Sequence, residues 1–246
     1  IMEVGSEVSK FVVGQRVFTH HHVACRSDDC HECSHDNETM CKKYSESNLE
    51  PCGLADEYVV PEWNVKHGGV LSISHHMSFE QAAMIEPLAC CVRAWESVIS
   101  VGNLRGKRTR RENKNDSVAI LGVGPTGIMH AMLANDQCFG KIFCLDLNEF
   151  RLNFVKKIKM RKHQDFNPIT IHPGKTNALE QIKSETANQG VDVVIVATSS
   201  LNALKDAVSF VRKGGTIVMF GVPSKGANVE LDMSEIYSKG ITIINS

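Results

Sequence analysis

The sequence has almost no net charge, no long apolar run and no visible secretory signal peptide. Its 27 Lys and Arg residues are matched by 28 Asp and Glu residues, so no overall field draws the chain to nucleic acid or to an anionic membrane surface. No apolar run approaches the roughly 20 residues that a membrane-spanning helix needs. These absences argue against nucleic-acid and membrane partners and favour a cytoplasmic protein that acts on a small molecule.

An initial methionine is also lacking. The chain begins at Ile1 inside a segment with β-type pattern, and it stops just after an apolar run at residues 241–244 that is typical of a strand. We therefore expect a fragment of a longer protein, with material missing at both ends. Its 246 residues suffice for one large domain or two modest ones.

Cysteine, in contrast, is plentiful, and four of the nine cysteines are closely spaced in a polar loop. The order is Cys25-x4-Cys30-x2-Cys33-x7-Cys41, with no apolar content that would fold the loop by itself. A tetrahedral Zn²⁺ ion takes four such ligands and would supply the missing ordering energy. Cys25 is the natural fourth ligand and Asp28 a poorer one. Four protein ligands leave no open position, so the predicted zinc is structural; unpaired surface thiols are the alternative.

Three consecutive histidines, His20, His21 and His22, precede this loop. Neighbouring residues on a strand point to opposite faces, so three in a row converge poorly on one ion. A surface or supporting role is favoured over a metal site.

The stretch that organises the rest of the chain is a glycine motif at residues 122–127. Apolar residues 117–121 lead into Gly122-x-Gly124-x-x-Gly127, and a helix-like segment follows. Strand, glycine turn and helix in this order form a binding site for a dinucleotide pyrophosphate at a helix N-terminus. Gly122 permits the tight turn, Gly124 lets the backbone approach the phosphates, and Gly127 lets the helix pack closely. The neighbouring Pro125, Thr126 and Ile128 are predicted cofactor-lining residues.

An acidic residue, Asp146, lies 19 positions past the last glycine, at the end of a second apolar run. Its carboxylate would accept hydrogen bonds from the adenosine ribose hydroxyls and repel a 2′-phosphate. NAD is therefore favoured over NADP. Leu147 and Arg151, just beyond, are predicted to take part in cofactor binding.

Alternating strand and helix patterns continue to the C-terminus and predict a doubly wound parallel sheet. We expect strands at 117–121, 164–167, 191–197, 216–220 and 241–244, with helices at 147–159, 177–188 and 201–211. Ligands bind at the carboxyl ends of strands in such sheets. Ala197, Thr198, Phe220, Gly221 and Val222 stand at those ends and are predicted to line the cofactor.

A carboxylate at an expected helix break, Glu86, is the remaining candidate. Ser78 and Gln81 form a capping-box pattern that opens a helix, and Pro87 disfavours helical geometry at the residue before it. Glu86 follows an apolar run, where a charge needs a partner. A structural ion pair and a metal-directed role are equally compatible with the sequence.

Taken together, the four-thiolate loop, Ile85-Glu86-Pro87-Leu88 and the Gly122-x-Gly124-Pro125-x-Gly127 turn resemble the zinc-dependent medium-chain dehydrogenases. Within them, the chain is most similar to the polyol (sorbitol), threonine and glucose dehydrogenase branch. The resemblance implies a Rossmann domain at residues 101–246 and a partial β-rich GroES-like catalytic domain at residues 1–100, with a zinc lobe near 25–41. It assigns Cys25, Cys30, Cys33 and Cys41 to structural zinc and Glu86 to the catalytic zinc site.

The function implied by this resemblance is hydride transfer between a secondary alcohol or polyol and NAD, by a homodimer or homotetramer. Two departures matter: the first cysteine interval is four residues where the family has two, and the family's other catalytic zinc ligands would lie upstream of Ile1. We therefore expect the catalytic zinc site to be incomplete here. The alternative is a non-catalytic, zinc-stabilised nucleotide-binding or redox-sensing protein. A nucleic-acid binder that uses the basic residues 108–111 ranks last.

Overall fold

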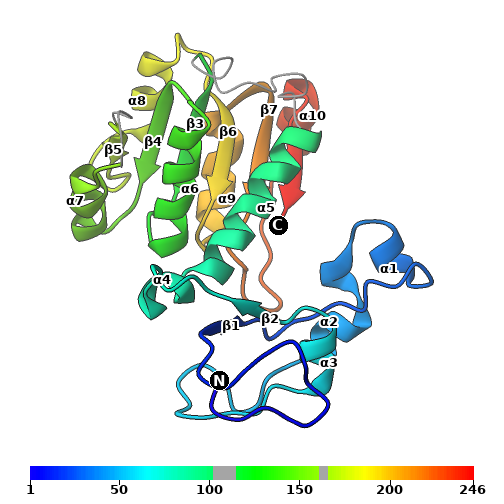
Figure 1. Ribbon diagram of the computed structural model, residues 1–246. Coiled ribbons are helices and arrows are strands. Elements are labelled where there is room, and N and C mark those ends of the chain that lie inside the picture. The colour runs from blue at the N-terminus through cyan, green and yellow to red at the C-terminus, as the bar shows by residue number, and fades with distance from the viewer. Residues whose placement is uncertain (102–114, 161–165) are drawn as a thin grey trace. The chain divides into compact units, whose positions relative to one another are not determined.

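The computed structural model describes residues 1–101, 115–160 and 166–246. The chain divides into two compact units, Ile1–Glu86 and Pro87–Ser246, drawn in Figure 1. Among the described residues, no helix has both the length and the apolar character that crossing a membrane requires. The basic residues 108–111 lie outside the described ranges.

The second unit is built on one six-stranded sheet in which every pair of neighbouring strands is parallel. Its strand order is β5-β4-β3-β6-β7-β8 (Figure 1). The strands are β3 (Ser117–Leu121), β4 (Lys141–Leu145), β5 (Ile169–Ile171), β6 (Val191–Val196), β7 (Val211–Met219) and β8 (Thr242–Asn245). The chain builds outward from β3 in one direction and then returns to place β6 on its other side. This order is that of the doubly wound dinucleotide-binding fold, with its switch point between β3 and β6.

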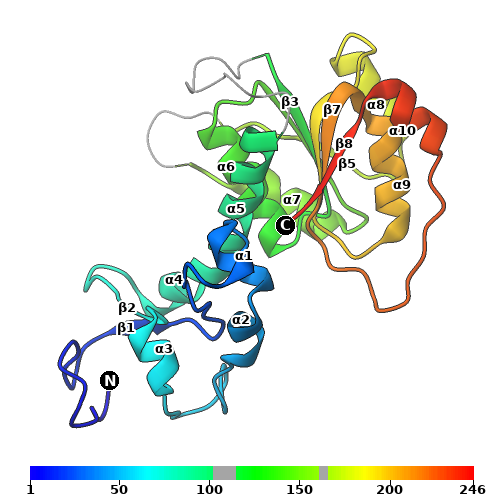
Figure 2. The ribbon, with the colours of Figure 1, turned by 90° about the vertical axis from the view of Figure 1, so that its right-hand side faces the viewer.

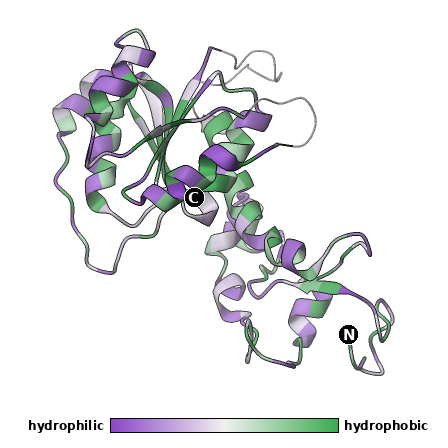
Figure 3. Ribbon diagram, turned by 90° about the vertical axis from the view of Figure 1, so that its left-hand side faces the viewer, coloured by the Kyte–Doolittle hydropathy of each residue, from purple (hydrophilic) through white to green (hydrophobic). Residues whose placement is uncertain are grey.

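Helices cover both faces of this sheet, as Figure 2 shows with the strands seen between them. One face packs with α5 (Ile85–Val101), α6 (Pro125–Asp136) and α7 (Glu149–Lys157), and the other with α8 (Ala178–Glu185), α9 (Leu201–Phe210) and α10 (Met233–Lys239). β3 is buried at all five positions, which suits a strand covered on both faces. The sheet strands carry the hydrophobic colours in Figure 3, while the helices alternate.

The predicted helices and strands are confirmed over most of this unit. Three helices begin later or end earlier than expected, because Asn148 and Asn177 cap the helices that follow them and α9 ends at Phe210. Residues 164 and 165 of the strand expected at 164–167 lie outside the described ranges. Residues 166 and 167 are not in a strand, and the edge strand is β5 at Ile169–Ile171. β5 has three residues and only one buried side chain, so it leaves little apolar signal.

The first unit holds one small antiparallel pair, β1 (Val17–Thr19) with β2 (Val70–Ser72). Short helices accompany it: α1 (His31–Ser34), a 3-10 turn at Glu38–Met40, α2 (Lys42–Glu46), α3 (Glu62–Lys66) and α4 (Phe79–Ala83). The sequence did not indicate β2. Asn64, fully buried, ties the unit together because its amide donates to His20 and Ser47 backbone oxygens at 3.2 and 3.1 Å.

The capping box that opens α4 is confirmed. Ser78 Oγ accepts from Gln81 N at 3.2 Å, and Gln81 Oε1 accepts from Ser78 N at 3.0 Å. The helix break falls at Met84, however, two residues before the expected position. Glu86 and Pro87 lie in the first turn of α5, where proline is tolerated because its missing N–H would have no intrahelical acceptor.

Candidate functional site

The glycine motif forms a tight turn between β3 and α6. Gly122 has φ of +90°, and a side chain there would meet the Ala197 carbonyl oxygen at 2.9 Å. Gly124 caps α6, and a Cβ on it would meet no heavy atom within 4 Å. The helix N-terminus with Pro125 at its first position is therefore open to an approaching group, which is how helices bind phosphates.

Two other glycines are required by close packing. A Cβ on Gly127 would lie 2.0 Å from the Gly122 carbonyl oxygen, so α6 rests directly on the turn. A Cβ on Gly221 would lie 2.3 Å from the Thr198 backbone. Both contacts join segments at the carboxyl edge of the sheet, where ligands bind in this fold.

Asp146 follows β4 beside this turn and is nine-tenths buried. Its Oδ2 accepts from Val123 N at 2.9 Å, and its Oδ1 accepts from Asn148 N at 2.8 Å. The carboxylate thus locks the glycine turn to the start of α7. Carboxylate oxygens have further lone pairs, so Asp146 can still accept hydrogen bonds from a ligand.

Arg151 lies one turn into α7, with Nη1 3.4 Å from Asp146 Oδ2. Half of its side chain is exposed. The guanidinium partly balances the buried carboxylate and keeps free donors that face solvent.

These elements surround a crevice of about 1170 Å³ at the carboxyl edge of the sheet. Nine of the predicted cofactor residues line it: Gly122, Gly124, Pro125, Thr126, Asp146, Leu147, Arg151, Ala197 and Thr198. Five others do not line it. Gly127 lies beneath the turn, Gly221 packs on Thr198, Ile128 and Phe220 pack against the core, and Val222 is 82% exposed.

Several lining residues were not anticipated. Phe150 projects from the first turn of α7, His172 and Pro173 follow β5, and Asn202 and Asp206 come from α9. His172 and Pro173 stand at a strand end like the predicted residues, so a correct placement of β5 would have identified them. No periodic pattern marks Phe150.

In the first unit, the four predicted cysteines lie together. Their sulfur atoms are all within 4.8 Å of one another, and no other such metal-binding group of His, Cys, Asp and Glu occurs in the described ranges. Three separations are 3.6 Å (Cys25–Cys41), 3.7 Å (Cys25–Cys33) and 3.9 Å (Cys30–Cys41). A tetrahedron with Zn–S bonds of about 2.3 Å has sulfur atoms about 3.8 Å apart. The cysteine set therefore fits tetrahedral zinc, with Cys25 in the fourth position.

The ionisation of these thiols is uneven when no cation is present. The backbone N–H of Cys25, with others, lowers the pKa of Cys41 to about 6. Desolvation raises the pKa of Cys33. At Cys30 a backbone N–H lowers the pKa, but desolvation and neighbouring side chains outweigh it and raise the value to about 12. The Cys41 thiol therefore loses its proton readily, whereas Cys30 and Cys33 tend to stay protonated. A bound divalent cation would favour the thiolate form of all of them.

Glu86 is half-buried and interacts electrostatically with His21, whose pKa is lowered chiefly by burial and raised slightly by this carboxylate. The ring centroids of His21 and His22 lie 3.9 Å apart, but His22 Nδ1 lies 3.0 Å from the Tyr44 carbonyl oxygen and the His22 ring stacks on the Tyr44 ring. None of the three histidines joins a metal-binding group in the described part of the chain.

Comparisons with known proteins agree with both halves of this description. Residues 1–68 match the alcohol dehydrogenase GroES-like domain, and residues 125–246 match the zinc-binding dehydrogenase family. Sorbitol dehydrogenase of Bacillus subtilis is 30% identical over 262 residues, which cover 100% of this chain and 67% of that protein. The chain belongs to the zinc-dependent medium-chain alcohol dehydrogenase superfamily. The predicted family and the predicted fold class are thereby confirmed.

Other relatives fit the same family. L-threonine 3-dehydrogenase of Pseudoalteromonas atlantica is 25% identical over 99% of this chain and 63% of its own length. The alcohol dehydrogenase TADH of Thermus sp. ATN1 shares the fold with a TM-score of 0.77 at 23% identity, over 100% of this chain and 65% of that one. A zinc-binding dehydrogenase of Sinorhizobium meliloti 1021, bound to NADP, shares the fold with a TM-score of 0.79 at 22% sequence identity. The match covers 100% of this chain and 65% of that one. The chain thus spans about two thirds of its relatives' length.

Proposed function

We propose that the protein is a zinc-dependent oxidoreductase that transfers a hydride between a secondary alcohol or polyol and NAD. The observation that carries this proposal is the crevice at the switch point of the sheet, with an open helix N-terminus at Gly124 and the buried carboxylate of Asp146 beside it. A helix N-terminus suits a pyrophosphate group, and a carboxylate suits the hydroxyls of a ribose. The sorbitol and threonine dehydrogenase relatives support an alcohol as the substrate class.

The charge of Asp146 determines the cofactor preference. The Sinorhizobium relative binds NADP, but its low identity carries no cofactor choice to this chain. Here Asp146 lies within the crevice, and only one guanidinium, that of Arg151, pairs with it among the described residues. A 2′-phosphate beside Asp146 would meet a carboxylate that is already fixed by two backbone N–H groups. NAD is the cofactor that this arrangement favours.

Zinc is proposed in two roles, held by different residues. Cys25, Cys30, Cys33 and Cys41 would hold a structural ion that orders residues 25–41. Glu86 would belong to a catalytic ion, whose chemistry when bound is to polarise the substrate oxygen. Glu86 belongs to no group of three or more metal-binding side chains among the described residues.

The chain's own residues would bind and orient the cofactor. The turn at Gly122 and Gly124 holds the pyrophosphate, while Asp146 and Arg151 hold the adenosine ribose. Ala197 and Thr198, at the end of β6, border the path toward the nicotinamide. Residues 101–246 would serve as the NAD-binding domain, in a cytoplasmic homodimer or homotetramer like others of this branch.

The test combines binding with activity. Calorimetry of the zinc-loaded 246-residue chain should show NAD binding, and metal analysis should show one zinc per chain. The longest natural form of the protein should hold two zinc ions per subunit and reduce NAD with sorbitol, L-threonine or a related alcohol. Absence of NAD binding together with absence of NAD reduction across the alcohol panel would reject the proposal. One zinc and no turnover, with NAD still bound, would favour a non-catalytic nucleotide-binding protein.

A further inference from the structure

An aromatic side chain stands exposed at the mouth of the crevice. Phe150 is 76% exposed although it is a large apolar residue, and it lines the crevice. Neighbouring Leu147 is 71% exposed and lines it as well. Exposed apolar groups gathered at a concave site are typical of surfaces that bind a ligand.

The backbone under Phe150 is firmly held. Asn148 caps α7, and its Oδ1 accepts from Phe150 N at 2.9 Å and from Arg151 N at 3.3 Å. Asn148 N donates in turn to Asp146 Oδ1 at 2.8 Å. The position of the Phe150 Cα is thus fixed relative to the carboxylate proposed to bind ribose.

The same helix carries a second exposed phenylalanine that differs in one respect. Phe154 stacks against Phe150 with ring centroids 6.4 Å apart and is 49% exposed, yet it does not line the crevice. The two rings therefore offer a matched pair on one helix, with similar chemistry and different access to the site.

The place of Phe150 indicates what it would contact. Pyrophosphate belongs at the glycine turn after β3 and ribose at Asp146 after β4, so the base continues past Asp146 toward α7 and the end of β5. There the crevice is bordered by His172 and Pro173, and the Nδ1 atom of His172 is buried without a hydrogen-bond partner among the described residues. This part of the crevice suits a flat, aromatic group with polar edges.

We propose that Phe150 is the stacking surface for the adenine ring of the cofactor. The proposal rests on the nucleotide-binding function proposed above and adds a contact that the glycine motif and Asp146 do not supply. Stacking of a base on an aromatic side chain is sequence-tolerant and strong enough to detect. Phe150 would hold the adenosine half of the cofactor in place.

The test is calorimetric titration of the 246-residue chain with ADP-ribose, which contains adenine and pyrophosphate but no nicotinamide. Phe150→Ala should weaken binding about 5- to 150-fold, the range expected for one base–aromatic contact. Phe150→Trp, which keeps a ring face, should retain most of the affinity. Phe154→Ala, the matched control, should bind like the wild type. Circular dichroism of each variant verifies that the chain is folded.

The possible failures are distinguishable. If the wild type binds no ADP-ribose, the proposed function fails and the stacking proposal fails with it. If the wild type binds and Phe150→Ala binds equally well, only the stacking proposal is overturned. An equal loss in Phe150→Ala and Phe154→Ala would also overturn it, because the effect would then come from α7 as a whole.

Discussion

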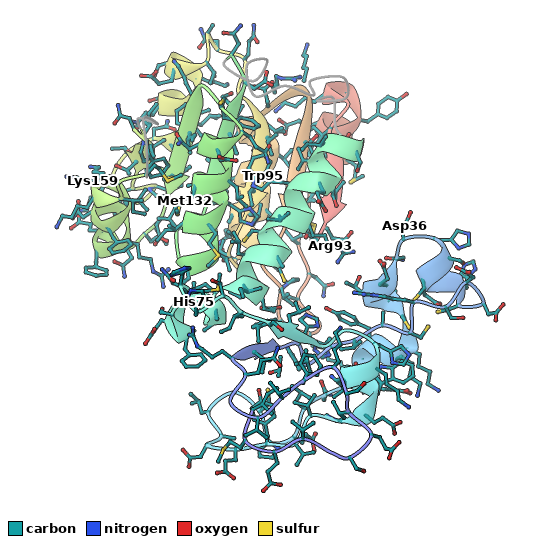
Figure 4. All side chains as sticks on the ribbon, in the orientation of Figure 1. Asp36, His75, Arg93, Trp95, Met132 and Lys159 are labelled. Carbon is teal, nitrogen blue, oxygen red and sulfur yellow. The ribbon has the colours of Figure 1, made fainter. Side chains whose placement is uncertain are left out.

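Residues 25–41 and the six-stranded sheet obtain their order in different ways. The sheet and its helices bury two large apolar clusters, with side chains such as Ile120, Phe143 and Ile195 fully enclosed. The cysteine loop buries only Cys41 among its four cysteines, and its helix α1 has no buried residue. Asp36, just past α1, marks this polar lobe in Figure 4. Apolar burial suffices to order the sheet, whereas the zinc ion proposed above would have to order the lobe.

The largest expected effect is that zinc removal unfolds residues 25–41 but leaves the sheet intact. Removing zinc with a chelator should cost the lobe its binding free energy, which is about 10–16 kcal/mol for small structural zinc sites. Amide hydrogen exchange at residues 25–41 should become fast, while β3 and β6 keep their protection. Cys33→Ser should reproduce the loss, and Cys52→Ser, an exposed cysteine outside the set, should not. Equal protection in the lobe before and after chelation would contradict the comparison.

The second expected effect is a loss of stability at low pH, caused by a histidine in the core beside the sheet. His130 on α6 is fully buried, and neither ring nitrogen has a hydrogen-bond partner among the described residues. It packs edge-on against Phe220, and its ring centroid lies 6.4 Å from that of Trp95 on α5. Burial lowers the pKa of His130 from 6.5 to about 4.

Protonation of His130 in the unfolded chain therefore destabilises the fold as pH falls from about 6.5 toward 4. The unfolded state binds the proton first, so the free energy of unfolding is greatest above 6.5. Between pH 7.5 and 5 this group should contribute a loss of about 2 kcal/mol. Urea unfolding of the wild type and of His130→Met at both pH values checks the difference. If the free energy of unfolding falls equally in both proteins between pH 7.5 and 5, His130 does not cause the loss.

The third effect distinguishes packing from binding within the glycine turn. Gly127→Ala should destabilise the second unit by about 1–3 kcal/mol, because its Cβ would collide with the Gly122 carbonyl. Gly124→Ala meets no atom within 4 Å and should change stability by less than about 0.5 kcal/mol. Thermal unfolding measures both. A larger loss in Gly124→Ala than in Gly127→Ala would refute the assignment of their roles.

The smallest expected effect is a loss of ADP-ribose affinity in Gly124→Ala. Gly124→Ala places a methyl group where the backbone is expected to approach phosphate oxygens, so ADP-ribose affinity should fall while the fold is kept. Calorimetry on the same variant gives the answer. Unchanged affinity would mean that the open space above Gly124 is not the phosphate site.

Local patterns predicted much of this molecule. β3, the glycine turn and the capping box at Ser78 are each specified by residues adjacent in sequence, so their structure followed directly. The four cysteines could be grouped because a polar loop with repeated thiols has few other uses. These features depend little on the rest of the fold.

Features that depend on tertiary packing could not be predicted from the sequence. β5 has one buried side chain in three residues, and β2 likewise has one, so neither shows an apolar run or a clear alternation. Phe150 resembles any residue of an amphipathic helix until the fold places it at the crevice. The two backbone hydrogen bonds of Asp146 arise because β3, β4 and α7 meet at that point.

The most direct test of the central proposal is calorimetric titration of the zinc-loaded chain with NAD and with NADP under identical conditions. A dinucleotide site in which Asp146 faces the adenosine ribose predicts saturable binding of one NAD per chain, at least about tenfold tighter than NADP. Binding of neither dinucleotide, or tighter binding of NADP, would contradict it.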